Sequence, residues 1–112
     1  MKRIIFIVIS ILVLQFISNI SISQPKGEIR GKVIDRLTQQ PVADAIVSIE
    51  KTEIKTGTDL NGEFRFTGLE SGTFTIKIST IGYIPILIND VVVMSGREAE
   101  VYAELDIIQT DE

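Results

Sequence analysis

Short segments in which apolar and polar residues alternate follow one another from residue 28 to residue 105, and this pattern limits the possible folds most strongly. Successive side chains of a β-strand point to opposite faces of a sheet, so the alternation predicts strands that each bury one face. No segment after residue 24 combines a sustained 3.6-residue period with helix-capping residues. The pattern predicts seven strands, at residues 28–35, 45–51, 55–58, 63–67, 73–80, 86–94 and 98–105.

The phase of the alternation predicts which side chains face the core. Turn residues recur between the strands at the spacing of an all-β sandwich, so we expect the inward side chains to fill the space between two sheets. Residues 86–94 are apolar on both faces, and their pattern fixes the register of that strand poorly. The expected inward residues are Ile29, Gly31, Val33, Ala45, Val47, Ile49, Phe64, Phe66, Phe74, Ile76, Ile78, Ala99, Val101, Ala103 and Leu105.

The segment Asp59-Leu60-Asn61-Gly62 lies between two predicted strands and has the composition of a tight turn. Asn61 and Gly62 tolerate the positive φ angles that hairpin turns require. The Asp59 carboxylate can accept backbone N–H groups and close the turn locally. We therefore interpret Asp59, Asn61 and Gly62 as a structural turn.

Calcium binding is an alternative role for the same segment. Asp59, Asn61, Glu63 and Glu70 have the offsets 1, 3, 5 and 12 of an EF-hand loop. However, Phe64 replaces the glycine that this loop needs at offset 6, and no flanking helices are predicted. We expect no metal site here.

The first 23 residues have the organisation of a secretory signal peptide. Lys2 and Arg3 precede an apolar run from Ile4 to Ile17, and the small-residue triplet Ser21-Ile22-Ser23 follows. We expect cleavage before Gln24 and an exported, periplasmic mature protein. A retained N-terminal anchor is the alternative, although the run is shorter than the roughly 20 residues that span a bilayer. No cysteine follows the run, which excludes a bacterial lipid-attachment site.

The composition excludes several classes of chemistry. The 112 residues include no His and no Cys, which rules out a Ser-His-Asp triad, a thiol nucleophile, a disulfide and a cysteine-bearing zinc site. With 11 basic and 15 acidic side chains the formal net charge is −4, which argues against nucleic-acid binding. We expect a non-catalytic module without a cofactor or a metal.

The two tyrosines, Tyr83 and Tyr102, are weak candidates for ligand contacts, since an aromatic ring can stack on a sugar. Two tyrosines without a tryptophan make a poor carbohydrate platform. Tyr83 is expected to pack at a sandwich edge with its hydroxyl in water.

Charged residues on the first and last predicted strands allow two further interpretations. Lys32 with Glu104 and Asp106 could form the intramolecular bond of pilin-like sandwiches, but Lys32 alternates outward, so a solvated lysine is expected. Glu98, Glu100 and Glu104 form an acidic stripe, which we interpret as a solvated strand face.

Several motifs occur in order along the predicted sandwich. They are Gly31-Lys32-Val33-Ile34-Asp35, Gln40-Pro41-Val42-Ala43-Asp44-Ala45, Val47-Ser48-Ile49, Gly57-Thr58-Asp59-Leu60-Asn61-Gly62-Glu63-Phe64, and Leu69 and Gly72 before Ile81-Gly82-Tyr83. Over about residues 27 to 105 the chain resembles the carboxypeptidase regulatory-like domain, a transthyretin-like β-sandwich of seven strands related in shape to immunoglobulin-like sandwiches. Asp44 departs from the family pattern at a turn position where many members have Gly.

This resemblance implies a domain that does no chemistry itself and lies beside a catalytic or transport domain. Many exported copies resemble the N-terminal extension of TonB-dependent outer-membrane receptors that import glycans or iron complexes. The implied partners are neighbouring receptor domains or other periplasmic and outer-membrane proteins. The organisation would be a signal peptide (1–23), a linker (24–27), a β-sandwich (28–106) and an acidic tail (107–112). A fragment of a receptor and a gene shortened to its first module both fit this organisation.

Two other functions are weighed against the receptor module. The first is a stand-alone periplasmic sandwich that binds a glycan or a protein. The second is a transthyretin-like hydrolase. It is disfavoured because hydrolases of that shape resemble sites built on His, and this chain has none.

Overall fold

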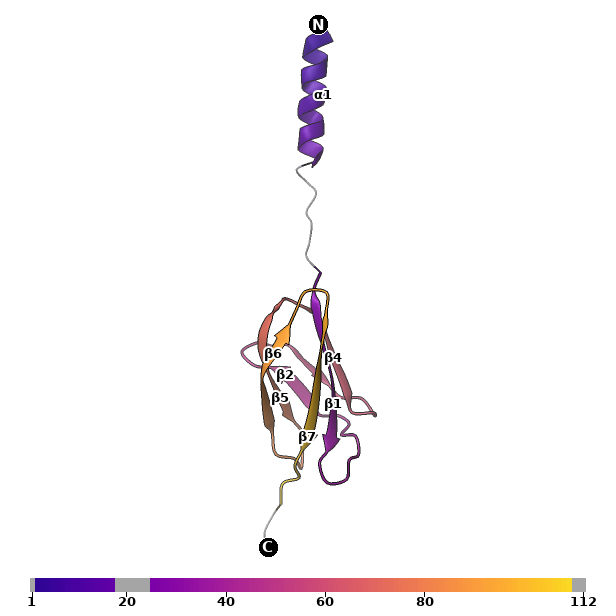
Figure 1. Ribbon diagram of the computed structural model, residues 1–112, viewed down its shortest axis with the longest axis vertical. Helices are drawn as coiled ribbons and strands as arrows, with labels where there is room; N and C mark the ends of the chain where they lie inside the picture. Colours follow the sequence, from indigo (N-terminus) through magenta and orange to yellow (C-terminus); the bar gives the residue numbers. More distant parts are fainter. Residues whose placement is uncertain (1, 18–24, 110–112) are drawn as a thin grey trace.

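The structure is a computed structural model that describes residues 2–17 and 25–109. Within these residues one helix, α1 (Lys2–Ile17), precedes seven strands (Figure 1). Each strand begins and ends within two residues of its predicted range, so the all-β prediction is confirmed. The strands are β1 (Gly27–Asp35), β2 (Ile46–Ile49), β3 (Lys55–Gly57), β4 (Glu63–Leu69), β5 (Gly72–Ser79), β6 (Ile86–Val93) and β7 (Glu98–Leu105).

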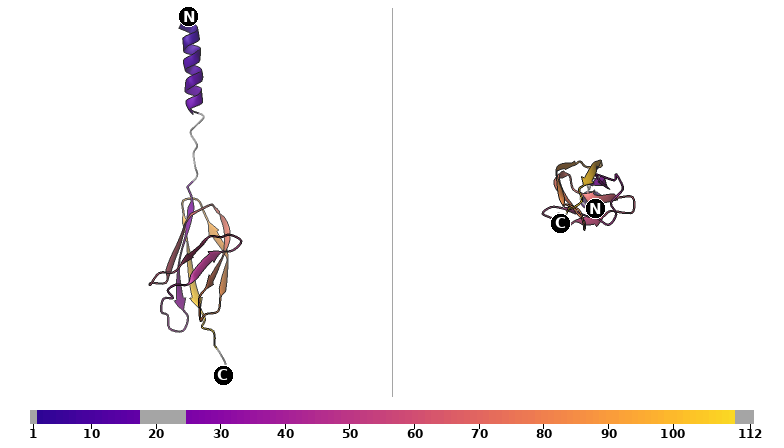
Figure 2. Two further views of the ribbon diagram at one scale, coloured as in Figure 1. Left: turned by 180° about the vertical axis from the view of Figure 1, so that it is seen from behind. Right: turned by 90° about the horizontal axis from the view of Figure 1, so that it is seen from below.

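The strands form two sheets that pack face to face as a β-sandwich. Sheet A has the order β4-β1-β7, and sheet B has the order β3-β2-β5-β6. The central strand of sheet A, β1, is antiparallel to β4 and parallel to β7. Figure 1 shows the molecule with β1 and β7 in front, and Figure 2 (left) turns it so that β2 is in front. Because β1 and β7 run in the same direction, the chain enters the sandwich at one end and leaves it at the other (Figure 1).

Most connections cross from one sheet to the other. Among the strands that the structure describes, only β2–β3 and β5–β6 join neighbouring strands of one sheet. The turn at Asp59–Gly62 joins β3 of sheet B to β4 of sheet A, so it is a tight turn between the sheets and not a hairpin within one sheet. The same turn chemistry serves both kinds of connection. The sheet that β4 joins depends instead on how β4 packs on β1.

The predicted inward side chains fill the space between the sheets. Phe74 and Ala99 are half-buried and pack against the cluster formed by the others. The hydroxyl of buried Thr58 accepts a hydrogen bond from the Ala45 N–H (2.9 Å) and donates to the Val42 carbonyl (2.7 Å), which holds the β1–β2 connection against β3. The buried apolar residues are Ile29, Val33, Ile34, Val42, Ala45, Val47, Ile49, Phe64, Phe66, Leu69, Ile76, Ile78, Val91, Val93, Val101, Ala103 and Leu105.

Gly31 on β1 makes room for an aromatic ring of β4. The two residues are paired across the strands, and a Cβ built on Gly31 would lie 2.2 Å from Cζ of Phe64. The ring of Phe64 meets that of Phe66 edge to face, with 6.0 Å between the ring centroids. This arrangement explains the glycine in the middle of an otherwise well-filled strand, because any side chain there would occupy the space of the ring.

A bulge sets the register of β6, the strand whose pattern was ambiguous. Phe74 of β5 pairs with Val91, whereas Ile76 pairs with Ile88, so β6 holds one extra residue between these pairs. Asp90 lies in this interval and has a φ of 59°. The bulge reverses the alternation, so Ile86 and Ile88 face the core before it, and Val91 and Val93 face the core after it.

The helix α1 presents exposed apolar side chains from Ile4 to Leu14. Among the described residues, no helix combines the length and the apolar character needed to cross a membrane. The expected cleavage point between Ser23 and Gln24 lies outside the described residues.

Candidate functional site

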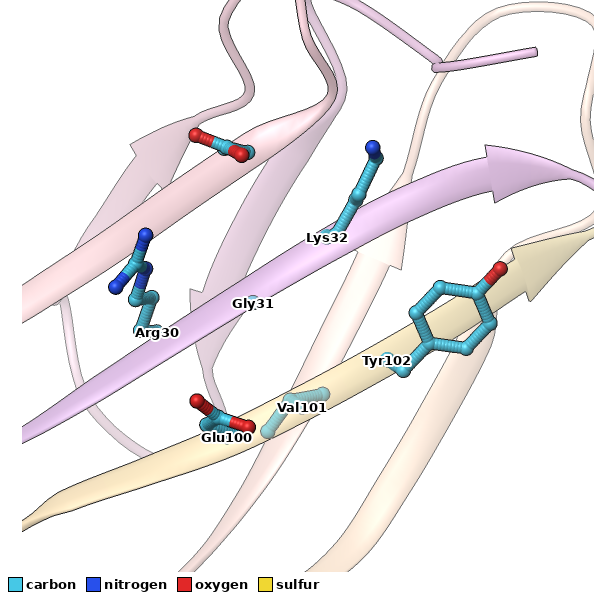
Figure 3. Close-up of a pocket in the computed structure, with 7 residues that line it drawn as sticks. Arg30, Gly31, Lys32, Glu100, Val101 and Tyr102 are labelled. Carbon is cyan, nitrogen blue, oxygen red and sulfur yellow. The ribbon is translucent and has the colours of Figure 1, made fainter.

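The outer face of sheet A carries an open hollow with a volume of about 490 Å³ (Figure 3). All three strands of the sheet contribute to it, and most of its side chains are charged. Their backbone positions are fixed by the pairing of β1 with β4 and β7, so the site is built on rigid strands. The lining residues are Arg30, Gly31, Lys32, Glu63, Glu100, Val101 and Tyr102.

The strand register places opposite charges beside each other in this hollow, which we call the sheet A hollow. Arg30 lies between Glu100 of β7 and Arg65 of β4 in the register. Lys32 lies between Tyr102 of β7 and Glu63 of β4. Each cation of β1 in the hollow therefore has one carboxylate opposite it, Glu100 for Arg30 and Glu63 for Lys32, whereas Arg65 places a second cation beside Arg30.

Ion pairing in the hollow is loose. Nη1 of Arg30 lies 3.6 Å from Oε1 of Glu98, and both side chains are partly exposed. Such exposed pairs contribute only about 0–1 kcal/mol to stability. Tyr102 is 62% exposed, and its ring stands on the outer face of β7 beside β1 (Figure 3). The hollow thus offers an accessible ring among charged donors and acceptors.

A second hollow of about 380 Å³ adjoins the first at the β4 edge of the sandwich. It shares Arg30 and Glu63 with the sheet A hollow and adds Thr56, Asp59 and Arg65. The two hollows form a polar surface that runs from β7 across β1 to the outer edge of β4.

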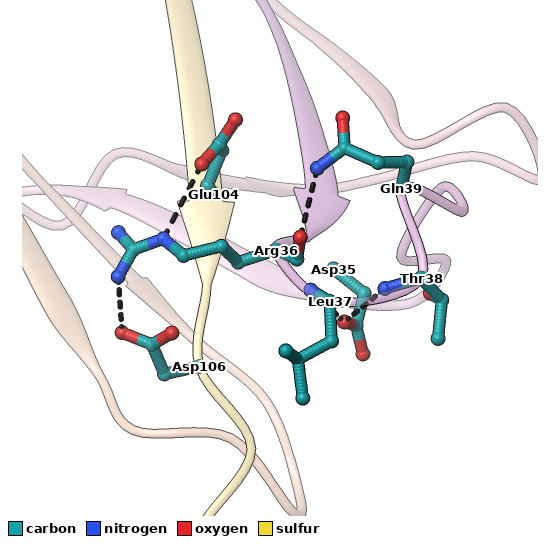
Figure 4. Close-up of polar contacts among 7 residues, drawn as sticks. All are labelled: Asp35, Arg36, Leu37, Thr38, Gln39, Glu104 and Asp106. Atoms are coloured by element: carbon teal, nitrogen blue, oxygen red, sulfur yellow. Dashed lines mark hydrogen bonds and ion pairs between the residues drawn. The ribbon is translucent and has the colours of Figure 1, made fainter.

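Asp35, at the end of β1, has its side chain fully hydrogen-bonded. Its Oδ1 accepts the backbone N–H groups of Leu37 (2.8 Å) and Thr38 (3.1 Å), as Figure 4 shows. Its Oδ2 accepts a hydrogen bond from the hydroxyl of Tyr83 at 2.8 Å. Asp35 is only 4% exposed, and these three donors satisfy a carboxylate that would be costly to bury unpaired.

These hydrogen bonds shift both side-chain pKa values. The Tyr83 hydroxyl, followed by the Thr38 N–H, lowers the pKa of Asp35 below its ordinary value of 3.8. The hydrogen bond to Asp35, followed by desolvation, raises the pKa of Tyr83 above its ordinary value of 10.0. The carboxylate and the neutral phenol are therefore the favoured forms over the pH range between these values.

The Asp35–Tyr83 contact ties sheet A to sheet B, because Asp35 ends β1 and Tyr83 lies between β5 and β6. The prediction that the Tyr83 hydroxyl lies free in water is wrong, since it donates to a buried acid. Sequence reasoning missed the pair because the two residues are 48 positions apart. The only available signal was that both residues belong to motifs of the family that the chain resembles.

The end of the sandwich beyond β7 extends past the predicted domain boundary. Tyr83 forms an isolated antiparallel bridge with Ile107. The Ile108 N–H donates to the Gly82 carbonyl at 2.9 Å. Backbone pairing thus reaches two residues into the segment 107–112, which the sequence suggested as a tail.

Arg36 forms ion pairs with two acidic side chains near this end of the sandwich. Its Nη1 lies 2.7 Å from Oδ2 of Asp106, and its Nε lies 3.3 Å from Oε2 of Glu104 (Figure 4). Lys32 is exposed on the outer face of sheet A. Glu104 and Asp106, the possible partners of Lys32 in a covalent bond, are therefore both paired with Arg36 instead.

The turn at Asp59 is closed by hydrogen bonds from its backbone N–H groups to the Asp59 carboxylate. Asp59 Oδ1 accepts the N–H groups of Asn61 and Glu63, each at 2.9 Å. Gly62 has a φ of 72°, and a Cβ built on it would lie 2.4 Å from the carbonyl oxygen of Val33. In residues 2–17 and 25–109, no group of three or more acidic, His or Cys side chains is placed to hold a metal ion.

The two tyrosines do not share a site. Tyr102 lines the sheet A hollow, whereas the hydroxyl of Tyr83 is engaged by Asp35. Sequence reasoning placed Arg30, Lys32 and Tyr102 on outward faces but did not bring them together. That placement depends on the parallel pairing of the first and last strands, which alternation does not encode. The arrangement places charged hydrogen-bonding groups beside one exposed aromatic ring, which can contact a polar ligand.

Comparisons with known proteins identify the kind of domain. A family model described as the CarboxypepD_reg-like domain matches residues 29–108. A comparison with curated protein sequences gives no match.

Solved structures of similar fold come from several bacteria. One chain of a type II cohesin–X-dockerin complex from Acetivibrio cellulolyticus, a C-terminal interface mutant, is 27% identical over 68% of this chain and 51% of that chain, with a TM-score of 0.58. A Bacteroides uniformis protein described as carbohydrate-binding is 19% identical over 72% and 41% of the two chains, with a TM-score of 0.57. The minor pilin of Streptococcus agalactiae is 17% identical over 81% and 48%, with a TM-score of 0.58. The chain thus spans about half the length of these structures, and the last two show the fold alone.

Proposed function

The chain belongs to the CarboxypepD_reg-like domain family, and we propose that it is an exported accessory module at the N-terminus of a TonB-dependent outer-membrane receptor. The family and its structural neighbours are mostly non-catalytic sandwich domains, which supports a module without chemistry of its own. The location within a receptor and the export of the protein are the parts of this function that we propose.

One observation carries the proposal beyond the family. The chain enters the sandwich at one end and leaves at the opposite end, because β1 and β7 are parallel. A domain with this layout can be inserted in line between a leader and a following domain. The backbone pairing of Ile107 and Ile108 with the β5–β6 connection anchors the exit, so a following segment would start from a rigid point.

Export is tested by the mature N-terminus. Mass spectrometry of the periplasmic fraction should find a protein that begins at Gln24, because the Ser-Ile-Ser triplet is the expected cleavage signal. Recovery of Met1 or Lys2 in the membrane fraction would instead show a retained anchor. A Ser23→Lys variant should accumulate with its leader attached and serves as the matched control.

The receptor role is tested by deleting residues 27–105 from the intact receptor reading frame. Barrel insertion should be retained, because the module is a separate sandwich, while substrate uptake or partner assembly should fall. Immunodetection of the barrel in the outer membrane controls for loss of protein. Unchanged uptake after the deletion would remove the transport role.

A second function is favoured by the sheet A hollow. An exposed tyrosine among charged donors and acceptors suits a periplasmic module that binds a glycan or a protein. In both roles the protein acts by binding. A binding module would show ligand affinity in the isolated sandwich even where the deletion leaves uptake unchanged.

A further inference from the structure

We propose that the sheet A hollow binds a neutral oligosaccharide, with one pyranose ring stacked on Tyr102. This inference deepens the binding role and does not depend on the receptor context. It uses the side chains of three neighbouring strands whose backbones are locked in register.

The charge pattern selects the class of ligand. Arg30 has Glu98 at 3.6 Å and Glu100 opposite it in the register, and Lys32 has Glu63 opposite. Each of these two cations thus has a carboxylate beside it, although Arg30 also has Arg65 opposite it on β4, and the carboxylates weaken attraction for a phosphate or another polyanion. The same balance disfavours a cationic ligand.

The hydrogen-bonding groups fit hydroxyls. Arg30 and Lys32 can only donate hydrogen bonds, and ionised Glu63 and Glu100 can only accept them. A sugar hydroxyl both donates and accepts, so adjacent hydroxyls of one ring can use the neighbouring donor and acceptor of each pair, Arg30 with Glu100 and Lys32 with Glu63. A purely apolar ligand would leave these charged groups desolvated and unpaired.

Tyr102 supplies the apolar contact. The residue is 62% exposed and lies opposite Lys32 on the outer face of the sheet. The C–H face of a pyranose can cover an aromatic face while its hydroxyls reach the surrounding polar groups. Counting aromatic residues in the sequence predicts a poor platform. The structure adds the polar groups placed around this one ring.

The adjoining hollow sets the expected length of the ligand. It continues from Arg30 and Glu63 to Thr56 and Arg65 at the β4 edge. An oligosaccharide can follow this surface from β7 to β4, whereas a monosaccharide would occupy only the part beside Tyr102. Binding should therefore strengthen with chain length.

The experiment titrates the purified, isotope-labelled protein with cellohexaose, maltohexaose, xylohexaose and mannohexaose, observed by ¹H–¹⁵N NMR. At least one probe should shift the amide signals of Arg30, Lys32 and Tyr102, with a dissociation constant of about 1 mM, since the hollow is open and holds one ring. Tyr102→Ala should weaken binding about tenfold, and Tyr102→Phe should retain it because the ring remains. Lys77→Ala, on the outer face of sheet B, is the control and should bind like the wild type.

The dissociation constant for a neutral oligosaccharide should depend little on salt concentration, because the ligand carries no net charge. A heparin-derived hexasaccharide that binds more tightly than every neutral probe would overturn the proposal. So would the absence of shifts at these three residues with all four neutral probes, or equal binding by Tyr102→Ala and the wild type. These outcomes leave the uptake test of the receptor role unaffected.

Discussion

Gly31 is a position at which one added methyl group should disturb the sandwich strongly. A Cβ built there would lie 2.2 Å from Cζ of Phe64 and 2.7 Å from the carbonyl oxygen of Val101. Phe64 is 3% exposed and packs edge to face on Phe66, so its ring has no free space to enter. The Val101 oxygen belongs to the backbone of β7, so relief on that side requires β1 and β7 to separate.

The magnitude follows from these two contacts. Overpacking a filled core costs about 1–3 kcal/mol, and Gly31→Ala should lie near the upper value because it meets backbone as well as a ring. A loss of about 3 kcal/mol is a large part of the roughly 5–15 kcal/mol that stabilises a folded domain. At about 4–8 °C per kcal/mol for a domain of this size, the melting temperature should fall by about 12–24 °C.

Urea and thermal unfolding followed by circular dichroism would measure the effect. Gly57→Ala is the matched control, since a Cβ there would have its nearest neighbour at 3.7 Å, and it should be neutral or stabilise by about 0.5–1 kcal/mol. In Gly31→Ala/Phe64→Leu the smaller side chain relieves the ring clash. The double variant should therefore cost about 0.5–3 kcal/mol less than the sum of the single costs. A Gly31→Ala variant within about 0.5 kcal/mol of the wild type would refute the packing argument.

Three further predictions concern stability. Phe66→Ala should cost about 3–5 kcal/mol because the ring is buried, and a wild-type denaturation midpoint would show that the inward face of β4 is misassigned. Gly62→Val should lower the melting temperature, because a β-branched residue resists the φ of 72° and its Cβ would meet the Val33 carbonyl; an unchanged temperature would contradict this. Tyr83→Phe should lower the melting temperature most between the ordinary pKa values of 3.8 for Asp35 and 10.0 for Tyr83. The lowered pKa of Asp35 gives stability that is lost as the pH falls through the folded-state pKa of Asp35, and the raised pKa of Tyr83 gives stability that is lost as the pH rises through the folded-state pKa of Tyr83. A difference in melting temperature between Tyr83→Phe and the wild type that stays constant across this range and beyond would therefore count against the contact.

Local patterns in the sequence determined the strands and most of their inward faces. The alternation of β1, β4 and β7 is regular, so residues such as Ile29, Phe66 and Leu105 are buried as expected. The turn residues Asp59 and Gly62 could also be interpreted locally, because a carboxylate that bonds its own loop and a positive φ depend on a few adjacent residues.

Pairing between distant segments was decided only by the tertiary structure. The sheet to which β4 belongs follows from the fit of Phe64 over Gly31, and the register of β6 follows from a bulge at Asn89 and Asp90 that alternation with period two does not place. The Asp35–Tyr83 bond likewise joins two sheets across 48 positions. Alternation with period two records which face a residue occupies but carries no information about the neighbouring strand. For the same reason the sheet A hollow, assembled from β4, β1 and β7, could not be predicted from any one of them.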